Sequence, residues 1–191
     1  MADNVDKNAR LPAGQYLVEK LPVLDLGRQP KINTDNWSLT LAGEIEAPQT
    51  LDWATLQKLP QREVVADIHC VTRWSRFDVP WVGVPASEII RLAQPKPKAK
   101  YVVLVAADEY TTNLPLAALL DEDVLFAYTL DGKPLPHKYG GPVRLVVPKR
   151  YFWKSAKWVT GLHFYETDHP GFWETRGYHN DADPFEEERF S

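Results

Sequence analysis

The chain has 191 residues, of which 44% are hydrophobic and 25% charged, values typical of one soluble globular domain. Its net charge of −4 disfavours nucleic acid or an anionic membrane surface as the main partner. No apolar run is long enough to span a bilayer, and residues 1–10 are polar without the features of a targeting signal. With a single cysteine and no such signal, the expected location is cytoplasmic.

The first half of the chain predicts loops and strands around one cysteine. A lead-in over residues 1–20 precedes residues 21–30, which are predicted to form a loop laid over the body. Alternating apolar residues predict strands over residues 37–43 and 64–69. Between these strands, Asp52 is placed to cap a short helix that Pro60 ends.

Cys70 follows the second of these strands directly. The Arg- and Trp-rich run after it, up to Pro80, is predicted to be a loop, because proline cannot donate to a sheet ladder. Reactive groups on rigid scaffolds tend to lie where a strand gives way to a loop.

The second half predicts a helix over residues 84–94 and a strand over residues 100–107 that is buried on both faces. A helical turn is expected at residues 114–120, and Asp131-Gly132 is a strong hairpin signal. Three further strands are predicted, at residues 124–129, 143–147 and 158–166. Strands and short helices alternate irregularly, so the predicted fold class is a single mixed α+β domain over residues 21–179, not a doubly wound parallel sheet. The acidic residues 180–191 are predicted to be a mainly solvated tail, although three nearby aromatic side chains indicate some packing.

Cys70 has three possible roles. It could be an inert core thiol, a nucleophile with His69 or another histidine as base, or the one protein thiolate on a metal that a cofactor mainly holds. A single cysteine can form neither an internal disulfide nor a structural zinc site alone. Arg73 and Arg76 lie close in sequence and would favour its thiolate.

Residues 132–165 contain no Asp or Glu but carry seven Lys or Arg residues. This segment also contains Gly140-Gly141-Pro142, where a backbone can approach a ligand, and Lys154-Ser155-Ala156-Lys157. Positive charge with hydroxyl and amide donors in a small volume suits a phosphate or pyrophosphate. An ordinary basic surface is an equally good interpretation, and a nucleic-acid patch is disfavoured by the acidic total.

Motifs of nucleotide-fold dehydrogenases, P-loop enzymes and common zinc enzymes are absent from the sequence. What remains is a lone thiol and a separate segment suited to phosphate. Five stretches accompany this combination, in this order: residues 66–75, 81–85, 140–148, 151–158 and 171–179. Together they resemble the molybdopterin-binding domain of the sulfite oxidase family, and in particular its small standalone bacterial branch.

The resemblance implies a mixed-sheet fold and a molybdenum-molybdopterin cofactor whose metal Cys70 ligates. It places the pterin-phosphate contacts on Arg144, Ser155, Ala156 and Lys157, with Tyr139 where relatives carry His or Asn. A loose match adds Asp25 to the cofactor site. Cys70-Val71-Thr72-Arg73-Trp74 departs from the Cys-Ala-Gly-Asn-Arg run of animal and plant sulfite oxidases, so the resemblance does not fix the substrate.

The leading hypothesis is an oxidoreductase that transfers an oxygen atom to or from a small oxyanion or sulfoxide. Cys70 would be catalytic, Arg73 and Arg76 would hold an anionic substrate, and a separate protein would exchange electrons, because no haem or flavin motif is present. One alternative is a catalytically silent pterin-binding module of the same fold. Another is a metal-free Cys–His hydrolase or transferase, which His69 supports poorly because neighbouring strand residues point to opposite faces.

Overall fold

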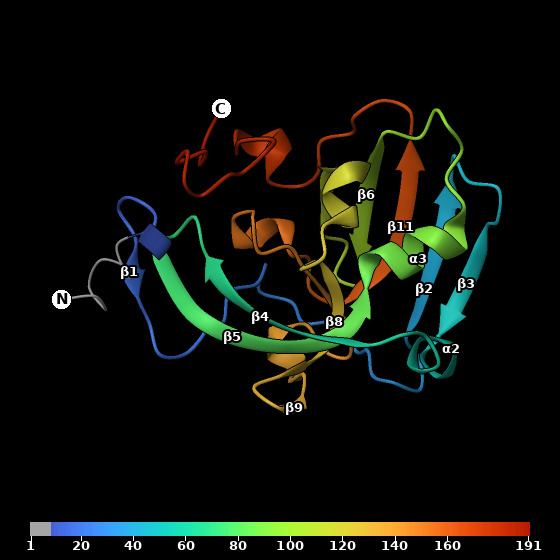
Figure 1. The fold of residues 1–191 in the computed structure, drawn as a ribbon, viewed down its shortest axis with the longest axis horizontal. Coiled ribbons are helices and arrows are strands. Elements are labelled where there is room, and N and C mark those ends of the chain that lie inside the picture. Colours follow the sequence, from blue (N-terminus) through green and yellow to red (C-terminus); the bar gives the residue numbers. More distant parts are fainter. Residues whose placement is uncertain (1–8) are drawn as a thin grey trace.

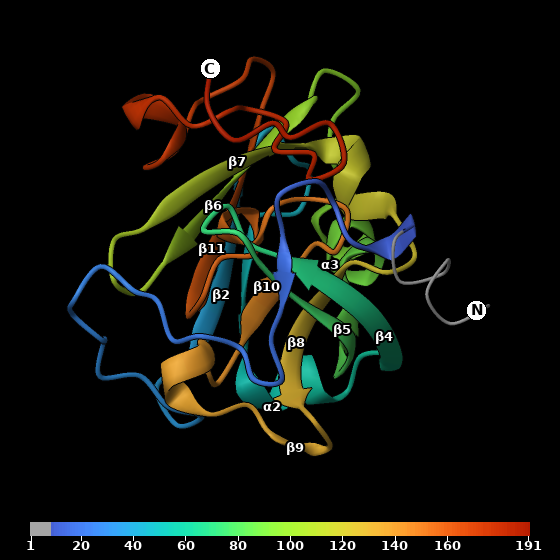
Figure 2. The same ribbon diagram turned by 90° about the vertical axis from the view of Figure 1, so that its left-hand side faces the viewer.

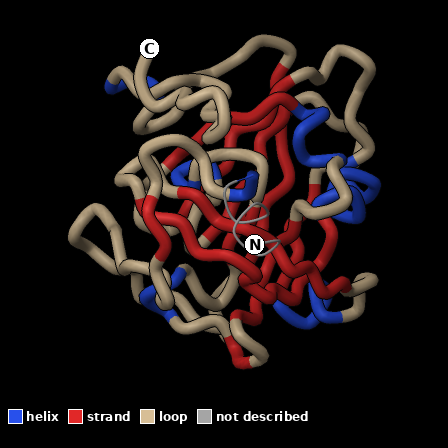
Figure 3. The backbone as a smooth tube through the Cα atoms, turned by 60° about the vertical axis from the view of Figure 1, so that its left-hand side comes forward, coloured by secondary structure: helices blue, strands red, loops and turns tan. Residues whose placement is uncertain are grey.

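The computed structural model describes residues 9–191 and contains two β-sheets with short helices around them (Figures 1 and 3). The strands are β1 (Tyr16–Leu17), β2 (Ser38–Gly43), β3 (Gln49–Asp52), β4 (Arg62–His69), β5 (Trp74–Pro85), β6 (Tyr101–Ala106), β7 (Thr111–Pro115), β8 (Leu125–Leu130), β9 (Lys133–Pro134), β10 (Arg144–Val146) and β11 (Val159–Tyr165). The α-helices are α2 (Trp53–Gln57) and α3 (Ala86–Ala93), and the 3₁₀ turns are η1 (Leu116–Leu120), η2 (His137–Tyr139), η3 (Phe152–Lys154) and η4 (Glu174–Arg176). None of the helices in this part of the chain has the length and apolar character that crossing a membrane requires.

Both sheets mix parallel and antiparallel pairs, as the α+β prediction requires. The five-stranded sheet has the order β3-β2-β11-β6-β7, with β2 and β11 parallel and the other pairs antiparallel. The six-stranded sheet has the order β1-β5-β8-β10, with β4 added on β5 and β9 on β8. The irregular order of strands and helices predicted from the sequence therefore corresponds to sheets with mixed strand directions.

Local signals placed several elements correctly. Asp52 caps α2, with its side chain accepting a hydrogen bond of 2.8 Å from the Thr55 N–H. Asp131 and Gly132 form a two-residue hairpin loop between β8 and β9, and both have positive φ, as a type I′ turn requires. The apolar run in β6 supplies Val102 and Leu104 to the main core, both with no exposed surface.

The predicted loop up to Pro80 is wrong, because β5 begins at Trp74 and runs through Pro80 to Pro85. β5 pairs antiparallel with β4, with Pro80 opposite Val65, so the connection between these strands is only residues 70–73. Pro80 lies just beyond the last β5–β8 pair, and its carbonyl accepts a hydrogen bond of 3.1 Å from the Asp131 N–H. The missing proline donor is therefore tolerated at the point where pairing with β8 stops.

The two ends of the described chain lie on the same side of the molecule, beside the β4–β5 hairpin (Figure 1). β1 pairs parallel with the beginning of β5, and Ala182 in the acidic tail is fully buried. The tail is therefore packed more extensively than predicted, although Phe185 and Phe190 remain exposed. In the orthogonal view the C-terminal coil passes above β1 (Figure 2).

Candidate active site

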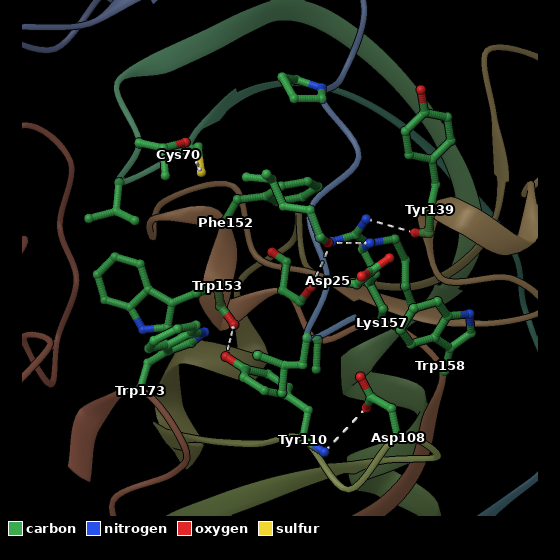
Figure 4. Close-up of a pocket in the computed structure, with 18 of the residues that line it drawn as sticks. Asp25, Cys70, Asp108, Tyr110, Tyr139, Phe152, Trp153, Lys157, Trp158 and Trp173 are labelled. Atoms are coloured by element: carbon green, nitrogen blue, oxygen red, sulfur yellow. Dashed lines mark hydrogen bonds between the residues drawn. The ribbon is translucent and has the colours of Figure 1, made fainter. Parts of the chain in front are cut away.

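A pocket with a cavity volume of about 180 Å³ lies between the Cys70 turn and the basic segment (Figure 4). Its wall comes from the loop before β2, the β4–β5 turn, the residues after β6, and the segments around η2, η3 and η4. All seven residues predicted to bind the cofactor line it: Asp25, Cys70, Tyr139, Arg144, Ser155, Ala156 and Lys157. Cys70 lies near Trp153 and Trp173 at one end, and Lys157, Tyr139 and Trp158 lie at the other.

Cys70 begins the tight turn of the β4–β5 hairpin. Its N–H donates to the Trp74 carbonyl and its carbonyl accepts from the Arg73 N–H, both at 2.9 Å. Arg73 has a φ of 76°, so the turn ends on a residue in the left-handed region, as in three-residue hairpin loops. This geometry leaves Cys70 only 7% exposed, with its sulfur accepting a hydrogen bond of 3.2 Å from the Thr72 hydroxyl.

Burial raises the pKa of the Cys70 thiol, while the Thr72 hydrogen bond and the charge of Arg189 act in the opposite direction. The sequence predicted that Arg73 and Arg76 would supply this charge, but Arg189, from the far end of the chain, does so. Among residues 9–191 no histidine is hydrogen-bonded to the Cys70 sulfur, and His69 Nδ1 instead lies 2.8 Å from the Ser75 hydroxyl. Burial also lowers the pKa of His69 to about 4. The Cys–His hydrolase hypothesis therefore loses its base.

Arg144 is a buried cation at the other end of the pocket, with 1% of its surface exposed. It donates to the carbonyls of Leu145, Tyr139 and Ser155 at 3.3, 2.8 and 2.7 Å, and its guanidinium lies 4.0 Å from the centre of the Phe152 ring. These bonds use three of five guanidinium N–H groups, and in the described chain no carboxylate pairs with it. Burial lowers the pKa of Arg144 to about 9. A buried cation with spare donors is suited to an anionic ligand.

Lys157 adds a second cation beside Arg144. Its ammonium donates to the carbonyls of Leu24 and Lys138, and burial together with the Arg144 charge lowers its pKa to about 8. Between residues 9 and 191, the backbone N–H groups of Ala156 and Lys157 have no hydrogen-bond partner. The Ser155 hydroxyl, by contrast, accepts a bond of 2.9 Å from the Val147 N–H. The segment thus offers two cations and two backbone donors to an anion, as its charge pattern predicted.

Two other predicted cofactor residues are already engaged within the protein. The Tyr139 hydroxyl donates to the Leu21 carbonyl at 3.0 Å. Asp25 accepts bonds of 2.9 Å from the side chain of Gln29 and the N–H of Gly27, and these bonds lower its pKa. Tyr139 therefore holds the loop before β2 against the pocket, whereas Asp25 stabilises a turn within that loop.

Arg73 and Arg76, predicted to hold substrate, do not line the pocket. Arg76 makes a bidentate ion pair with Asp131, with N–O distances of 2.9 and 2.6 Å. Arg73 is exposed and lies in the left-handed region at the end of the turn. Salt bridges of these arginines to Asp67 or Asp78 were the alternative prediction, but Arg10 pairs with both carboxylates instead.

Sequence reasoning missed the aromatic wall at the Cys70 end, which is formed by Trp153, Trp173 and Tyr178. A buried ion pair supports this wall: the ammonium of Lys154 lies 2.6 Å from Glu174, and their side chains are 0% and 2% exposed. The same Glu174 oxygen accepts bonds from the Trp153 indole N–H at 3.0 Å and the Thr112 hydroxyl at 2.9 Å. Two stretches of the family resemblance, residues 151–158 and 171–179, contained most of these residues, but nothing in the sequence assigned them to the Cys70 end of the pocket.

The pocket fits a cofactor that brings its own metal ligands. In residues 9–191 no group of three or more His, Cys, Asp and Glu side chains is placed to hold a metal ion. A metal at this site would therefore take one thiolate from Cys70 and its other ligands from the cofactor, a combination that suits a soft metal. The spare donors around Arg144 would meet the cofactor's phosphate.

Comparisons with known proteins agree with this fit. The model of the oxidoreductase molybdopterin binding domain matches residues 26–173. The chain is 43% identical over 187 residues to an uncharacterized oxidoreductase, YuiH, of Bacillus subtilis, a match that covers 97% of this chain and 94% of YuiH. It is 32% identical to the protein-methionine-sulfoxide reductase catalytic subunits MsrP of Ralstonia nicotianae and Campylobacter jejuni, over 72% and 84% of this chain. It spans only 46% and 59% of those two proteins.

The fold also matches a solved structure. The sulfane dehydrogenase SoxCD from Paracoccus pantotrophus aligns with a TM-score of 0.68 and 19% identity, over 91% of this chain and 54% of the SoxCD chain. At this identity the likeness concerns the fold alone. Together with the family match and the relatives above, it confirms the predicted resemblance: this chain belongs to the oxidoreductase molybdopterin binding domain family, with the mixed-sheet fold of sulfite oxidase-like proteins.

Proposed function

We propose that this protein uses a molybdenum-molybdopterin cofactor, ligated through Cys70, to transfer an oxygen atom to or from a small sulfur-containing substrate. The observation that carries the proposal is one pocket with a thiol at one end and, at the other, a buried arginine with two spare N–H groups. The family model supplies the identity of the cofactor.

Each end of the pocket has a separate task in this proposal. Arg144, Lys157 and the N–H groups of Ala156 and Lys157 would bind the phosphate and fix the cofactor's position. Cys70 would bind the metal, and Thr72 would orient its sulfur. When bound, the cofactor supplies two-electron redox chemistry at the metal, and the protein supplies position, charge and exclusion of water.

The lining near Cys70 favours a neutral sulfoxide over an oxyanion. This end is formed by Val71, Thr72, Trp153, Trp173 and Tyr178. The pocket's cationic lining residues in the described chain are at the phosphate end, where Lys157 lies and where Arg144 donates to the Tyr139 carbonyl. An aromatic wall suits a substrate with apolar substituents around a polar S–O group, whereas sulfite or nitrate would need a cation there. The names of the MsrP relatives, which are sulfoxide reductase subunits, point the same way.

An oxyanion substrate is the second candidate, and Arg73 is the residue that would serve it. Arg73 lies exposed on the same turn as Cys70, so it could attract an anion without touching the pocket wall. If the substrate is an oxyanion, Arg73→Gln raises KM for it; if it is a sulfoxide, the same substitution leaves KM unchanged. A separate electron-transfer protein remains part of the proposal in both cases.

Metal and pterin analysis of protein made in a molybdenum-replete host tests the proposal. Cys70→Ser should lower the molybdenum content by about tenfold or more, because a hydroxyl is a poor ligand for a soft metal. Arg144→Met should lower both molybdenum and pterin. Lys98→Met is the matched control, since Lys98 is an exposed cation that pairs with Glu44 and does not line the pocket. Wild-type protein without molybdenum or pterin would refute the proposal.

The catalytically silent module makes a different prediction. It would load cofactor through the same residues but show no turnover with dye-linked sulfoxides, sulfite or nitrate. A steady-state rate that Cys70→Ser abolishes would exclude it.

A further inference from the structure

The turn that carries Cys70 is held by side chains from both ends of the chain. The Gln15 side-chain amide donates to the Cys70 carbonyl at 3.0 Å. The Arg189 guanidinium donates to the Val71 carbonyl at 2.8 Å and, through its other terminal nitrogen, to the Ala13 carbonyl at 3.2 Å. Arg189 thus connects the C-terminal tail, the N-terminal segment and the turn.

Both holding side chains lie outside residues 26–173, the part that the family model matches. Among residues 9–191 the turn is otherwise fixed by few bonds: the two backbone bonds between Cys70 and residues 73 and 74, the bond from the Thr72 hydroxyl to the Cys70 sulfur, and the bond from the Tyr16 N–H to the Arg73 carbonyl at 2.8 Å. The last of these also comes from the N-terminal segment, so the family domain alone does not complete the support of this turn.

The turn requires support because its backbone is strained. A non-glycine residue in the left-handed region, as at Arg73, costs about 1–2 kcal/mol. Val71 and Thr72 line the pocket, so a shift of this turn would move the Cys70 sulfur relative to the pocket wall.

Both holding side chains are themselves fixed. Gln15 is 9% exposed, and its carbonyl oxygen lies 3.4 Å from the Ser75 hydroxyl, which in turn contacts His69. The Arg189 guanidinium lies 5.0 Å from the centre of the fully buried Tyr151 ring. A charged donor with a fixed position makes a stronger and more directional bond to a carbonyl than a mobile surface side chain does.

We infer that Gln15 and Arg189 are positioning residues that clamp the Cys70–Arg73 turn from both sides and so set where the Cys70 sulfur faces the pocket. Neither residue touches the pocket. This inference rests on the proposed role of Cys70 as metal ligand.

Amide hydrogen exchange and the molybdenum(V) electron paramagnetic resonance signal of full-length holoprotein test the clamp. The variants are Arg189→Met, Arg189→Lys and Gln15→Leu. The matched control is Arg176→Met, because Arg176 belongs to the same C-terminal region but stacks on Phe172, with its guanidinium 3.6 Å from the ring centre, and does not contact the turn.

Arg189→Met should accelerate exchange of the amides of residues 70–73 by about tenfold or more, since it removes charge-assisted bonds. It should also change the g-values of the resonance signal, which a merely stabilising residue would not do. Arg189→Lys should restore part of both effects, because an ammonium keeps the charge but cannot bridge two carbonyls as a planar fork does. Exchange within β6 and all properties of Arg176→Met should match wild type.

Unchanged exchange at residues 70–73 and an unchanged signal in Arg189→Met would overturn the inference. If Arg189→Met also accelerates exchange in β6, this variant is globally destabilised. Arg189→Lys and Gln15→Leu then test the clamp by the same two measurements, exchange at residues 70–73 and the resonance signal. If wild-type protein contains no molybdenum, the proposed function fails, while the exchange measurement on the same preparation still decides whether the clamp exists.

Discussion

Glu174→Gln should destabilise the protein strongly, because it leaves a buried ammonium without an opposite charge. Glu174 and Lys154 are almost completely buried, with 2.6 Å between the ammonium nitrogen and the carboxylate oxygen. Glutamine keeps an oxygen that can accept from Lys154, Thr112 and Trp153. It removes the negative charge and little else, since the other carboxylate oxygen has no partner among the described residues.

The magnitude follows from this geometry. Removing one partner of a buried ion pair costs about 3–5 kcal/mol, and the retained hydrogen bonds place the expected loss near the lower figure. For a domain of this size, a loss of about 3 kcal/mol lowers Tm by roughly 6–12 °C. Burial already lowers the pKa of Lys154, and without Glu174 that pKa falls further.

The pH dependence of the loss has a definite sign. Between the lowered pKa of Lys154 in the folded variant and the ordinary lysine value of about 10.4, the unfolded chain binds more protons than the folded one. Stability of the variant therefore rises with pH over this window, and it rises more steeply than that of wild type.

Urea unfolding of wild type, Glu174→Gln and the double variant Lys154→Met/Glu174→Gln at pH 7 and pH 9 measures these effects. The double variant should be more stable than Glu174→Gln alone, because no unpaired ammonium remains at residue 154. Glu88→Gln is the control: Glu88 pairs with Arg91 on the surface, and its loss should cost at most about 0.5 kcal/mol. A Glu174→Gln loss as small as that of Glu88→Gln, or one that grows with pH, would refute the reasoning.

Three further outcomes are expected. Arg73→Gly should stabilise the protein by about 0.5 kcal/mol in urea unfolding, because relief of the left-handed backbone exceeds the entropy cost of glycine; a loss would show that the Arg73 side chain contributes contacts. Gly140→Ala should weaken the binding of inorganic phosphate measured by calorimetry, since the new Cβ would lie 2.8 Å from the Lys157 Cβ and displace it. Gly132→Ala is the control: this glycine also has a positive φ, but no atom lies within 4 Å of the added Cβ, so phosphate binding should be unchanged. Because the pKa of Lys157 is about 8, phosphate affinity should be highest below pH 8 and fall by up to about tenfold per pH unit above it; a flat profile would show that Lys157 does not need its charge.

Local chemistry made much of the fold predictable. Capping by Asp52 and the Asp131-Gly132 turn depend on residues that are neighbours in sequence, so their structures follow from the residue types. β5 was missed because Pro80 lacks the N–H that a sheet ladder needs, although the Trp, Phe and Val residues of this segment favour a strand. Its conformation depends on pairing with β4 and β8. β7 was missed for a related reason: its polar Asn113 is buried because Asp168 and Asn180, distant in sequence, hydrogen-bond to it.

The candidate site divides in the same way. The absence of acids marked residues 132–165 as a candidate anion-binding segment without any structure. The family resemblance then singled out Arg144 and Lys157 within it. Arg73 and Arg76 were assigned because they are near Cys70 in sequence, but nearness does not determine where a side chain points. Arg76 instead pairs with Asp131 in the turn between β8 and β9. Arg189 is 118 residues away from Val71, and no local signal could associate the two.

The connection made by Arg189 has a consequence for how the protein matures. Synthesis proceeds from the N-terminus, so residues 13–16 and the hairpin exist long before residue 189 is added. A cofactor that bound to the nascent chain would bind beside a β4–β5 turn that still lacks its hydrogen bond from Arg189. A cofactor that binds after the tail has docked would instead find the complete binding site. This difference favours insertion of the cofactor as the last step in the assembly of this protein.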